Sequence, residues 1–395
     1  VHTSFILMED IGIFIFDFSK HLTYNERKRQ NERRRLRAMS EYRISEILPT
    51  DRRGMDQVNS LLEKEGIRKD KNLDYTVGLY DENYRLAATG SCFGNTLRCM
   101  AVDSDFQGEG LLGQLISHLT EYQYGRGNFH LFLYTKCSKA MFFKDLGFYE
   151  IARSDGEAVF MENKKSGFAD YLKRLVQETD ESGAVPSRSG LPVGAVVMNA
   201  NPFTLGHQYL LEKAASACSL LHLFVVSEDV SLVPFPVRFQ LVKQGISHLS
   251  NVVLHKTGSY LISNATFPSY FLKDEDSAIC SHARLDVRLF QSIAKALSVS
   301  VRFVGEEPFS QVTGLYNQVM ISEAEAGGGP SVTVIPRLEQ EGHTVSASLV
   351  RSLIHDGRLE EIRSLVPETT YRYFTSEEAA PVVQAIQDSP QVIHY

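Results

Sequence analysis

The chain has no tryptophan and only five cysteines among its 395 residues. The cysteines are odd in number and scattered, and none forms a Cys-x-x-Cys pair, which argues against a disulfide framework or a zinc site. They are typical of reduced thiols, so the sequence predicts a cytoplasmic protein. No apolar run reaches the length of about eighteen residues that a membrane span needs, and none is predicted.

An excess of positive charge is also missing, since the net charge is −7 and the sequence pI is about 6.0. The overall electrostatics therefore do not favour nucleic acid as a partner. A hydrophobic content of 43% and a charged content of 23% are those of an ordinary soluble protein. The chain is too long for one compact core, so two domains are predicted.

The stretch DESGAVPSRSGLP, at residues 180–192, is rich in serine, glycine and proline and is the best candidate for a linker. The two domains are predicted at residues 41–165 and 193–375. A helix and the linker join them at 166–192, and a C-terminal tail follows at 376–395.

The first forty residues fit neither domain. FILMEDIGIFIFDF is apolar but is interrupted by acidic residues, and no basic region precedes it, so it does not resemble a secretory signal. The basic run NERKRQNERRRLR follows, which a solvated helix, a disordered extension or nucleic-acid binding could explain. The chain begins with Val1, and a start near Met39 fits as well. Residues 1–40 are predicted to be a disordered extension or a mis-assigned start.

Residues 41–165 carry strand and helix patterns around a glycine-bearing loop, QGEG, which opens the segment QGEGLLG. A loop of this kind exposes consecutive backbone N–H groups to a pyrophosphate. A turn that merely tolerates glycine explains the same residues. The segment YEIAR is predicted as the last strand of this domain.

Beyond the linker, apolar strand patterns alternate with helical ones. The predicted strands are GAVVM, LHLFVVS, NVVLHK, VRFVG and SVTVIPR. This order predicts an α/β domain with a parallel sheet that is covered by helices on both faces. In such a sheet, ligands bind beyond the carboxyl ends of the strands.

The segment NANPFTLGH follows the first of these strands, where a nucleotide is expected. Thr204 is a candidate N-cap, and Gly206 and His207 fall in the first helical turn. The unpaired N–H groups and the dipole of that turn favour phosphate. Gly206 would let a phosphate approach the backbone, and His207 could donate a hydrogen bond to it. A capped helix whose histidine faces solvent is the alternative.

A second motif, VSASLVRSLI, follows the last strand. Ser346 is predicted to cap a helix, Ser348 lies in its first turn, and Arg351 can reach back over that turn. Because arginine binds phosphate in a bidentate manner, these side chains could hold the β and γ phosphates. Alone, the motif is a capped helix with an exposed arginine. Together, the two motifs predict a two-sided phosphate clamp.

TLGH with SASLVR resembles the paired signature of the HxGH-type nucleotidyltransferases, with threonine in place of the first histidine. The resemblance implies attack on the α-phosphate of a nucleoside triphosphate and release of pyrophosphate. It implies that Thr204 and His207 stabilise the transition state, and that Ser346, Ser348 and Arg351 hold the pyrophosphate. Positioning and electrostatics suffice for this chemistry. ATP and Mg²⁺ are the implied cofactors, although no clear carboxylate site for the metal is visible.

Other residues near these motifs are predicted to meet ATP. Arg238, in VPFPVRFQLV, could reach the triphosphate or form a surface ion pair. Gly305 and Glu306, after the fourth strand, could meet the adenosine or form a plain turn. The predicted ATP-binding residues are Asn199, Asn201, Pro202, Phe203, Thr204, Gly206, His207, Arg238, Gly305, Glu306, Ser346, Ser348 and Arg351, of which Thr204, His207 and Arg351 are the catalytic candidates. No metal ligand is predicted.

In the first domain, the order of strand, QGEG loop, helix, strand and FFKDLGFYEI resembles the GNAT acyltransferase fold. The corresponding loop of that family binds the pyrophosphate of a CoA-type cofactor. This implies a role in binding a CoA-like prosthetic group for Gln107, Gly108, Glu109, Gly110 and Gly113. Leu112 departs from the family pattern, which has glycine or alanine there. Tyr134 and Tyr149 are candidates for a general base.

A GNAT-like domain before a TxGH nucleotidyltransferase domain resembles the citrate (pro-3S)-lyase ligase family. The similarity runs from about Tyr42 to about Tyr373 and includes VMNANPFTLGH, LHLFVVSED, GSYLISNATFPSYFLKD, RFVGEEPFSQVTGLYN and SASLVR. The resemblance implies that ATP activates acetate as acetyl-adenylate. The acetyl group then passes to the thiol on the acyl carrier subunit of citrate lyase, whose prosthetic group derives from dephospho-CoA.

Two other functions fit the same motifs. One is an adenylyltransferase that acts on a cofactor precursor such as a phosphopantetheine. The other is a sensor that binds a CoA-type ligand through the GNAT-like domain without chemistry there.

Overall fold

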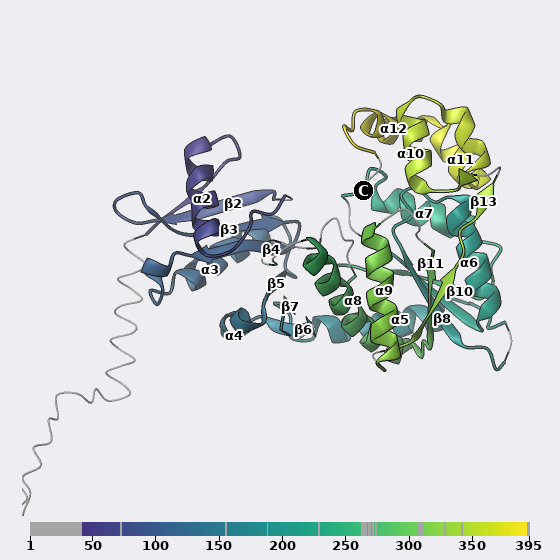
Figure 1. Cartoon of the computed structure of the whole chain (residues 1–395), viewed down its shortest axis with the longest axis horizontal. Helices are drawn as coiled ribbons and strands as arrows, with labels where there is room; N and C mark the ends of the chain where they lie inside the picture. The colour runs from purple at the N-terminus through teal and green to yellow at the C-terminus, as the bar shows by residue number, and fades with distance from the viewer. Residues whose placement is uncertain are drawn as a thin grey trace, which may run out of the picture.

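The computed structural model describes residues 42–392, apart from positions 72, 155, 188, 228–229, 262–266, 268–269, 271, 273–274, 307–310, 328 and 341–342. The expectations for residues 1–40 lie outside this part of the chain. Two domains lie side by side in Figure 1, and each contains its own sheet.

The N-terminal domain is built on a seven-stranded sheet with the order β1-β2-β3-β4-β5-β7-β6. The strands are β1 (Arg43–Glu46), β2 (Tyr75–Tyr80), β3 (Leu86–Phe93), β4 (Thr96–Val102), β5 (Phe132–Lys136), β6 (Tyr149–Ser154) and β7 (Ala158–Glu162). Neighbouring strands are antiparallel except β4 and β5, which are parallel. The predicted mixed sheet is confirmed.

The parallel strands β4 and β5 pair only at their beginnings, where Thr96 and Leu97 face Phe132 and Leu133. Beyond these pairs the sheet opens toward the carboxyl ends of both strands. The QGEG loop follows β4 and the short helix η2 (Ser104–Phe106), and it leads into α3 (Leu111–Gly125). The loop therefore lies beside this opening.

Three further helices surround the first sheet: α2 (Arg52–Lys64), η3 (Cys137–Lys139) and α4 (Ala140–Asp145). Strand β7 corrects the prediction that YEIAR is the last strand of the domain. It lies between β5 and β6, and all of its residues are buried. A strand covered on both faces lacks the polar and apolar alternation of a half-exposed strand, and AVFME shows no such pattern.

The C-terminal domain contains a five-stranded sheet in the order β10-β9-β8-β11-β12. Its strands are β8 (Val193–Met198), β9 (Leu220–Val225), β10 (Val252–Lys256), β11 (Val301–Gly305) and β12 (Ser331–Ile335), and all are parallel. The order reverses between β8 and β11, so a crevice is expected at their carboxyl ends. The predicted α/β domain with a parallel sheet is confirmed.

Helices cover both faces of this sheet. On one face, α6 (Leu205–Ala217) and α7 (Phe235–Gly245) pack against apolar residues of β8, β9 and β11. On the other face lie α5 (Gly167–Glu181), which follows the first domain, and α8 (Glu275–Leu297). Helix α9 (Gln311–Glu325) packs against α8 and β12.

The last part of the chain is helical. It comprises α10 (Ala347–His355), η4 (Leu359–Ser364), α11 (Glu368–Phe374), η5 (Glu377–Ala379) and α12 (Ala380–Gln387), after the short strands β13 (Glu339–Gln340) and β14 (His343–Thr344). Val382, Ile386 and Val392 are buried in one cluster with Val350 and Ile354 of α10. The prediction of a tail from residue 376 is therefore wrong for the described residues, because this stretch packs against the second motif helix.

The two domains share apolar contacts. One core cluster joins Tyr134 and Phe160 of the first sheet to residues of α8 and of the second sheet. The Phe267 ring lies edge-on to Tyr134, with centroids 5.4 Å apart, and stacks on His282 of α8 at 4.4 Å. At the same boundary, the Tyr260 hydroxyl donates a hydrogen bond to Glu162.

Candidate functional site

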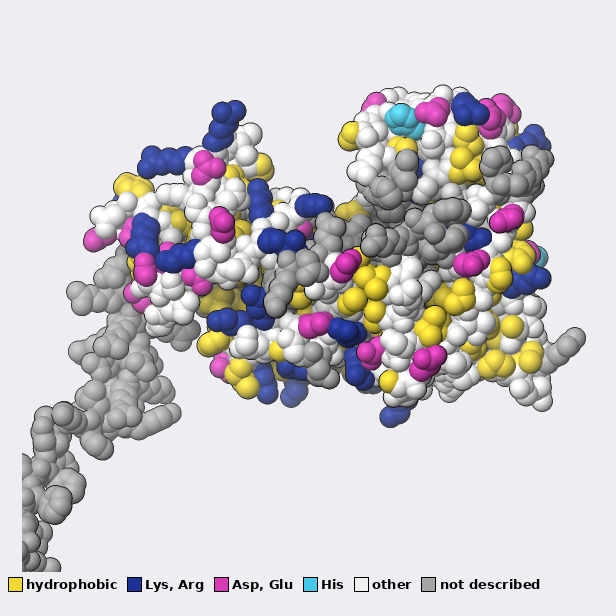
Figure 2. Space-filling view, viewed as in Figure 1, with side chains coloured by type: hydrophobic (Ala, Val, Ile, Leu, Met, Phe, Trp, Pro, Cys, Tyr) yellow, Lys and Arg dark blue, Asp and Glu magenta, His cyan; other side chains and the backbone are white. Residues whose placement is uncertain are grey.

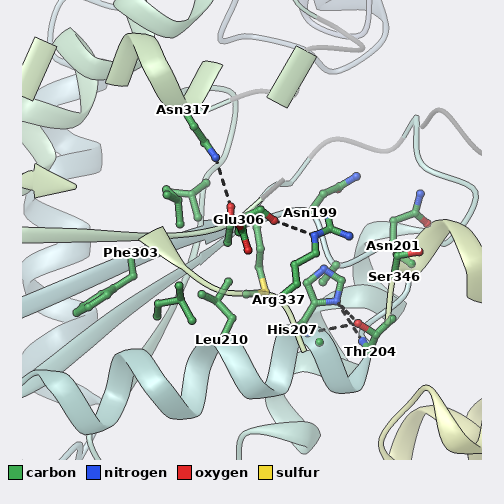
Figure 3. Close-up of a pocket in the computed structure, with 18 of the residues that line it drawn as sticks. Asn199, Asn201, Thr204, His207, Leu210, Phe303, Glu306, Asn317, Arg337 and Ser346 are labelled. Carbon is green, nitrogen blue, oxygen red and sulfur yellow. Dashed lines mark hydrogen bonds between the residues drawn. The ribbon is translucent and has the colours of Figure 1, made fainter. Parts of the chain in front are cut away.

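A cavity of about 660 Å³ lies at the carboxyl ends of β8, β11 and β12 (Figure 3). Of the predicted ATP-binding residues, all except Pro202, Phe203 and Arg238 line it. The two motifs, which are more than a hundred residues apart in the sequence, therefore face one space.

Thr204 is the N-cap of α6, as predicted. Its side chain accepts a hydrogen bond from the backbone N–H of His207, and its own backbone N–H donates to Nδ1 of the His207 ring at 3.1 Å. Because a backbone N–H can only donate, Nδ1 must carry no proton in this arrangement. The neutral ring then holds its proton on Nε2, which can donate to a bound anion.

Desolvation within the cavity lowers the pKa of His207 to about 4, and the charges of Arg337 and Arg351 act in the same direction. The imidazole is therefore neutral at physiological pH. A neutral ring can stabilise phosphate only as a hydrogen-bond donor, which is the role that its tautomer permits.

Gly206 brings the two motifs into contact. A Cβ atom at this position would lie 2.8 Å from the carbonyl oxygen of Val345, the first residue of the second motif. The sequence pattern predicts close approach of a phosphate at this glycine. The structure adds a requirement of its own, since any side chain here would push against fixed backbone.

Ser346 caps α10 by accepting a hydrogen bond from the backbone N–H of Leu349, as predicted. Arg351 lines the cavity but is buried, so the alternative of an exposed arginine is wrong. Its Nε donates to the carbonyl oxygen of Val392 and its Nη1 to that of Asn201, while Nη2 donates to the Ser348 hydroxyl. Arg351 thus ties the second motif to the first motif and to the C-terminal segment.

Arg238 is a correction to the predicted site. It is completely buried and lies outside the cavity lining, so it is not a surface residue either. Its guanidinium donates to the carbonyl oxygens of Val233, Asn199 and Val226 and to Oδ1 of Asn199. Arg238 therefore orders the backbone that follows β8 and β9.

Pro202 and Phe203 are also absent from the cavity lining. Phe203 is fully buried and packs so closely on Gly245 that a Cβ atom there would lie 2.3 Å from the ring. It anchors α6 against α7. Asn201 is buried too, and its side chain accepts a hydrogen bond from the backbone N–H of Val233. These residues shape the loop that presents the first motif.

Gly305 and Glu306 line the cavity at the end of β11, and their contact with the adenosine stays a prediction. Two residues near them were missed by the sequence reasoning. Asn317 of α9 donates a hydrogen bond to the carbonyl oxygen of Gly305, and Nε of Arg337 donates to that of Glu306 at 2.8 Å. Arg337 follows β12 directly after Pro336, so its place beyond a strand end was the available signal.

The QGEG loop of the first domain is exposed. Gly108 and Gly110 adopt positive φ values of 89° and 79°, and nothing lies within 4 Å of an added Cβ at either position. Gly110 is the N-cap residue of α3 and makes no side-chain cap. The Glu109 carboxylate accepts a hydrogen bond from the Tyr42 hydroxyl. Gln107 is exposed, and Gly113 lies inside the first turns of α3.

Comparison with known proteins identifies the family. Residues 193–374 match the family model of the citrate lyase ligase C-terminal domain. The citrate (pro-3S)-lyase ligase of Klebsiella pneumoniae is 43% identical over 293 residues, which cover 73% of this chain and 83% of that protein. This chain belongs to the citrate lyase ligase family. The Haemophilus influenzae citrate (pro-3S)-lyase ligase is 37% identical over 334 residues, covering 83% of this chain and 97% of that protein. The chain is accordingly an enzyme of the ligase class.

Similarity to solved structures is weaker than similarity to these relatives. The ribosomal-protein-S18-alanine N-acetyltransferase of Escherichia coli is 22% identical, with a TM-score of 0.25, and covers 31% of this chain and 92% of that one. A Vibrio parahaemolyticus protein assigned as a nicotinate-nucleotide adenylyltransferase is 14% identical, with a TM-score of 0.32, and covers 50% of this chain and 97% of that one.

This citrate lyase ligase family member has a second polar wall in its cavity, which the sequence reasoning missed. It is formed by His282, Asp286, Arg302 and Tyr316. Arg302 and Asp286 form a buried ion pair at 2.5 Å. Burial and the Asp286 carboxylate raise the pKa of Tyr316 well above its ordinary value, so its hydroxyl keeps its proton at neutral pH.

Within the described part of the ligase chain, no group of three or more His, Cys, Asp or Glu side chains could hold a metal ion. No described helix is long and apolar enough to cross a membrane. All five cysteines are described and each is a free thiol. Figure 2 shows basic and acidic side chains interspersed on the visible face of both domains.

Proposed function

We propose that this chain activates acetate with ATP and then acetylates the thiol of the prosthetic group on the acyl carrier subunit of citrate lyase, which switches that enzyme on. Family membership supports the proposal, since the relatives are named for citrate lyase. The observation that carries it is the convergence of both phosphate motifs on one cavity, with Gly206 against Val345.

In the first step, a carboxylate oxygen of acetate attacks the α-phosphorus of ATP. A new O–P bond forms, the bond to the bridging oxygen breaks, and its electron pair leaves with pyrophosphate. No proton moves, so no general base is required. The Nε2–H of His207 stabilises the charge on the α-phosphate, and Ser346, Ser348 and the first turn of α10 bind the pyrophosphate.

In the second step, the prosthetic-group thiol attacks the carbonyl carbon of acetyl-adenylate. The S–C bond forms, the bond from that carbon to the phosphate oxygen breaks, AMP leaves, and the thiol proton passes to solvent. The QGEG loop would hold the pyrophosphate of the prosthetic group, since Gly108 and Gly110 leave its backbone open to a ligand.

Mg²⁺ enters this reaction as part of MgATP. Among the described residues, the carboxylates that line the cavity belong to Asp286, which pairs with Arg302, and to the exposed Glu306. They do not form a cluster, whereas Mg²⁺ commonly binds through substrate phosphates and waters. The metal therefore enters the site as a component of the substrate.

Acetate-dependent exchange of radiolabelled pyrophosphate into ATP tests the first step. Exchange with acetate alone is expected, and its absence contradicts the proposal. Replacing His207 with alanine should lower exchange by about 10²- to 10³-fold, as loss of one donor to a developing oxyanion does elsewhere. Persistent exchange in a folded variant would show that the site is assigned incorrectly.

The same assay separates the two rival functions. Exchange only with a phosphorylated cofactor precursor would indicate an adenylyltransferase of that class. Binding of a CoA analogue without any exchange would indicate a sensor. Transfer of labelled acetyl to the carrier thiol tests the second step directly.

A further inference from the structure

We propose that Arg337 is a catalytic residue that binds the phosphate chain of ATP opposite His207. The inference rests on the proposed function, because it assigns a further residue to the same reaction. The sequence reasoning gave the phosphate-binding charge to Arg238 and Arg351. Both are buried and hold backbone carbonyl oxygens, so the cation that meets the nucleotide must be sought elsewhere in the cavity.

The arginines that line the cavity are Arg302, Arg337 and Arg351. Arg302 is buried and paired with Asp286 at 2.5 Å, so that carboxylate offsets its charge. Arg337 differs from the other two because it is only half-buried. Its guanidinium can therefore be reached by a ligand that occupies the cavity.

The backbone around Arg337 fixes the direction of its side chain. Strand β12 ends at Ile335, whose carbonyl oxygen accepts a hydrogen bond from the backbone N–H of Glu306. The carbonyl oxygen of Glu306 in turn accepts the hydrogen bond from Nε of Arg337. This pair of bonds orients the plane of the guanidinium across the end of β11, at the edge where a parallel sheet binds ligands.

Arg337 lies close enough to His207 to act on it. Figure 3 draws its guanidinium next to the His207 ring, and Arg337 is the first charged group that lowers the pKa of this histidine. The two side chains come from α6 and from the end of β12, so they approach the cavity from different elements. A phosphate between them would receive the Nε2–H of His207 and the planar donors of Arg337, a geometry suited to bidentate binding.

The buried Arg351 has a different role from the one proposed for Arg337. The hydrogen bonds of Arg351 hold Ser348 and the first motif in place, so its role is to position the second motif. Arg337 supplies positive charge where negative charge moves from the α-phosphate to the departing pyrophosphate. Binding that strengthens as this charge develops raises the rate of the chemical step.

The test compares the wild type with Arg337→Gln, Arg337→Lys and the control Arg372→Gln. Arg372 is exposed on α11, away from the cavity, and pairs with Glu368. Acetate-dependent exchange should fall by about 10²- to 10³-fold in Arg337→Gln. Arg337→Lys should recover part of this loss, and the control should match the wild type. Exchange within about twofold of the wild type in Arg337→Gln overturns the inference.

A second readout excludes a purely structural role. The pKa of His207, followed by the NMR titration of its ring proton, should rise above about 4 in Arg337→Gln and stay unchanged in the control. Loss of exchange with an unchanged His207 pKa overturns the inference.

If the wild type itself shows no acetate-dependent exchange, the proposed function fails. Arg337 is then judged by MgATP binding in equilibrium dialysis, which should weaken at least about tenfold in Arg337→Gln; unchanged binding refutes its role.

Discussion

The Nε atom of Arg351 donates a hydrogen bond of 2.7 Å to the carbonyl oxygen of Val392, 41 residues further along the chain. Through its Nη1 the same guanidinium holds the carbonyl oxygen of Asn201. A single buried side chain therefore connects the C-terminal segment to both motifs. The family match ends at residue 374, so the acceptor Val392 lies beyond the matched region while Arg351 lies within it.

Deletion of residues 389–395 should weaken the site, because it leaves the buried Nε of Arg351 without this acceptor. A lost hydrogen bond to a charged group costs about 1.5–3 kcal/mol, so acetate-dependent exchange should fall about tenfold or more. Deletion of residues 393–395 alone is the matched control, since Val392 is retained. Equal activity of the two truncated proteins would contradict a positioning role for the C-terminal segment.

Gly206→Ala should separate the two motifs. The added Cβ would lie 2.8 Å from the carbonyl oxygen of Val345, which is backbone and cannot rotate away. Overpacking of this kind costs about 1–3 kcal/mol, and both the unfolding free energy and exchange should decrease. Gly125→Ala, at the end of α3 with nothing within 4 Å, should leave both within error. Unchanged exchange in Gly206→Ala would mean that the contact between the motifs is dispensable.

Gly110→Val should impair acetyl transfer while sparing adenylate formation. The substitution places a branched side chain in the exposed QGEG loop, at a residue whose φ is 79°. Transfer of labelled acetyl to the carrier thiol should fall at least about tenfold, with pyrophosphate exchange retained. Gly127→Val is the control, because Gly127 has a similar φ of 81° and open space at the other end of α3. Equal loss of both steps would exclude the assigned role of the loop.

His222 should make the fold sensitive to acid. Burial and the neighbouring His255 lower its pKa to about 3 from the ordinary 6.5. The unfolded state therefore binds more protons between these values, so the stabilising contribution is complete above pH 6.5 and is lost as the pH falls toward 3. The slope should approach about 1.4 kcal/mol per pH unit in urea titrations.

In His222→Phe this slope should be smaller, whatever the absolute stability of the variant. The exposed His248→Gln serves as the control and should keep the slope of the wild type. A slope that His222→Phe leaves unchanged would assign the acid sensitivity to another group.

The elements of both domains were predictable wherever local patterns determined them. Thr204 and Ser346 cap their helices as expected, because capping depends on neighbours three residues away. Strand β7 was not predicted, because burial on both faces removes the polar and apolar alternation that marks a strand. The helices after residue 376 were not predicted, because they are stabilised by packing on α10. Such a tertiary contact leaves no local sequence pattern.

Most of the residues predicted to bind ATP line one cavity, and other residues of its lining were not predicted from the sequence. ATP binding itself stays a prediction. The motif residues do line one cavity, since parallel strands bring their carboxyl ends together. The roles of the arginines could not be read from spacing. Whether a guanidinium is half-exposed at a cavity or buried among carbonyl oxygens depends on the surrounding fold, and this burial separates Arg337 from Arg238 and Arg351.

The core cluster that runs from Tyr134 through Phe267 to α8 has a consequence for dissection of the chain. Tyr171 and Leu175 of α5, directly before the linker, are buried in this cluster as well. Separation of the two halves at residues 182–192 would expose aromatic side chains that each half covers on the other. Because of these shared contacts, we expect the two halves to unfold together, although their sheets belong to separate folds.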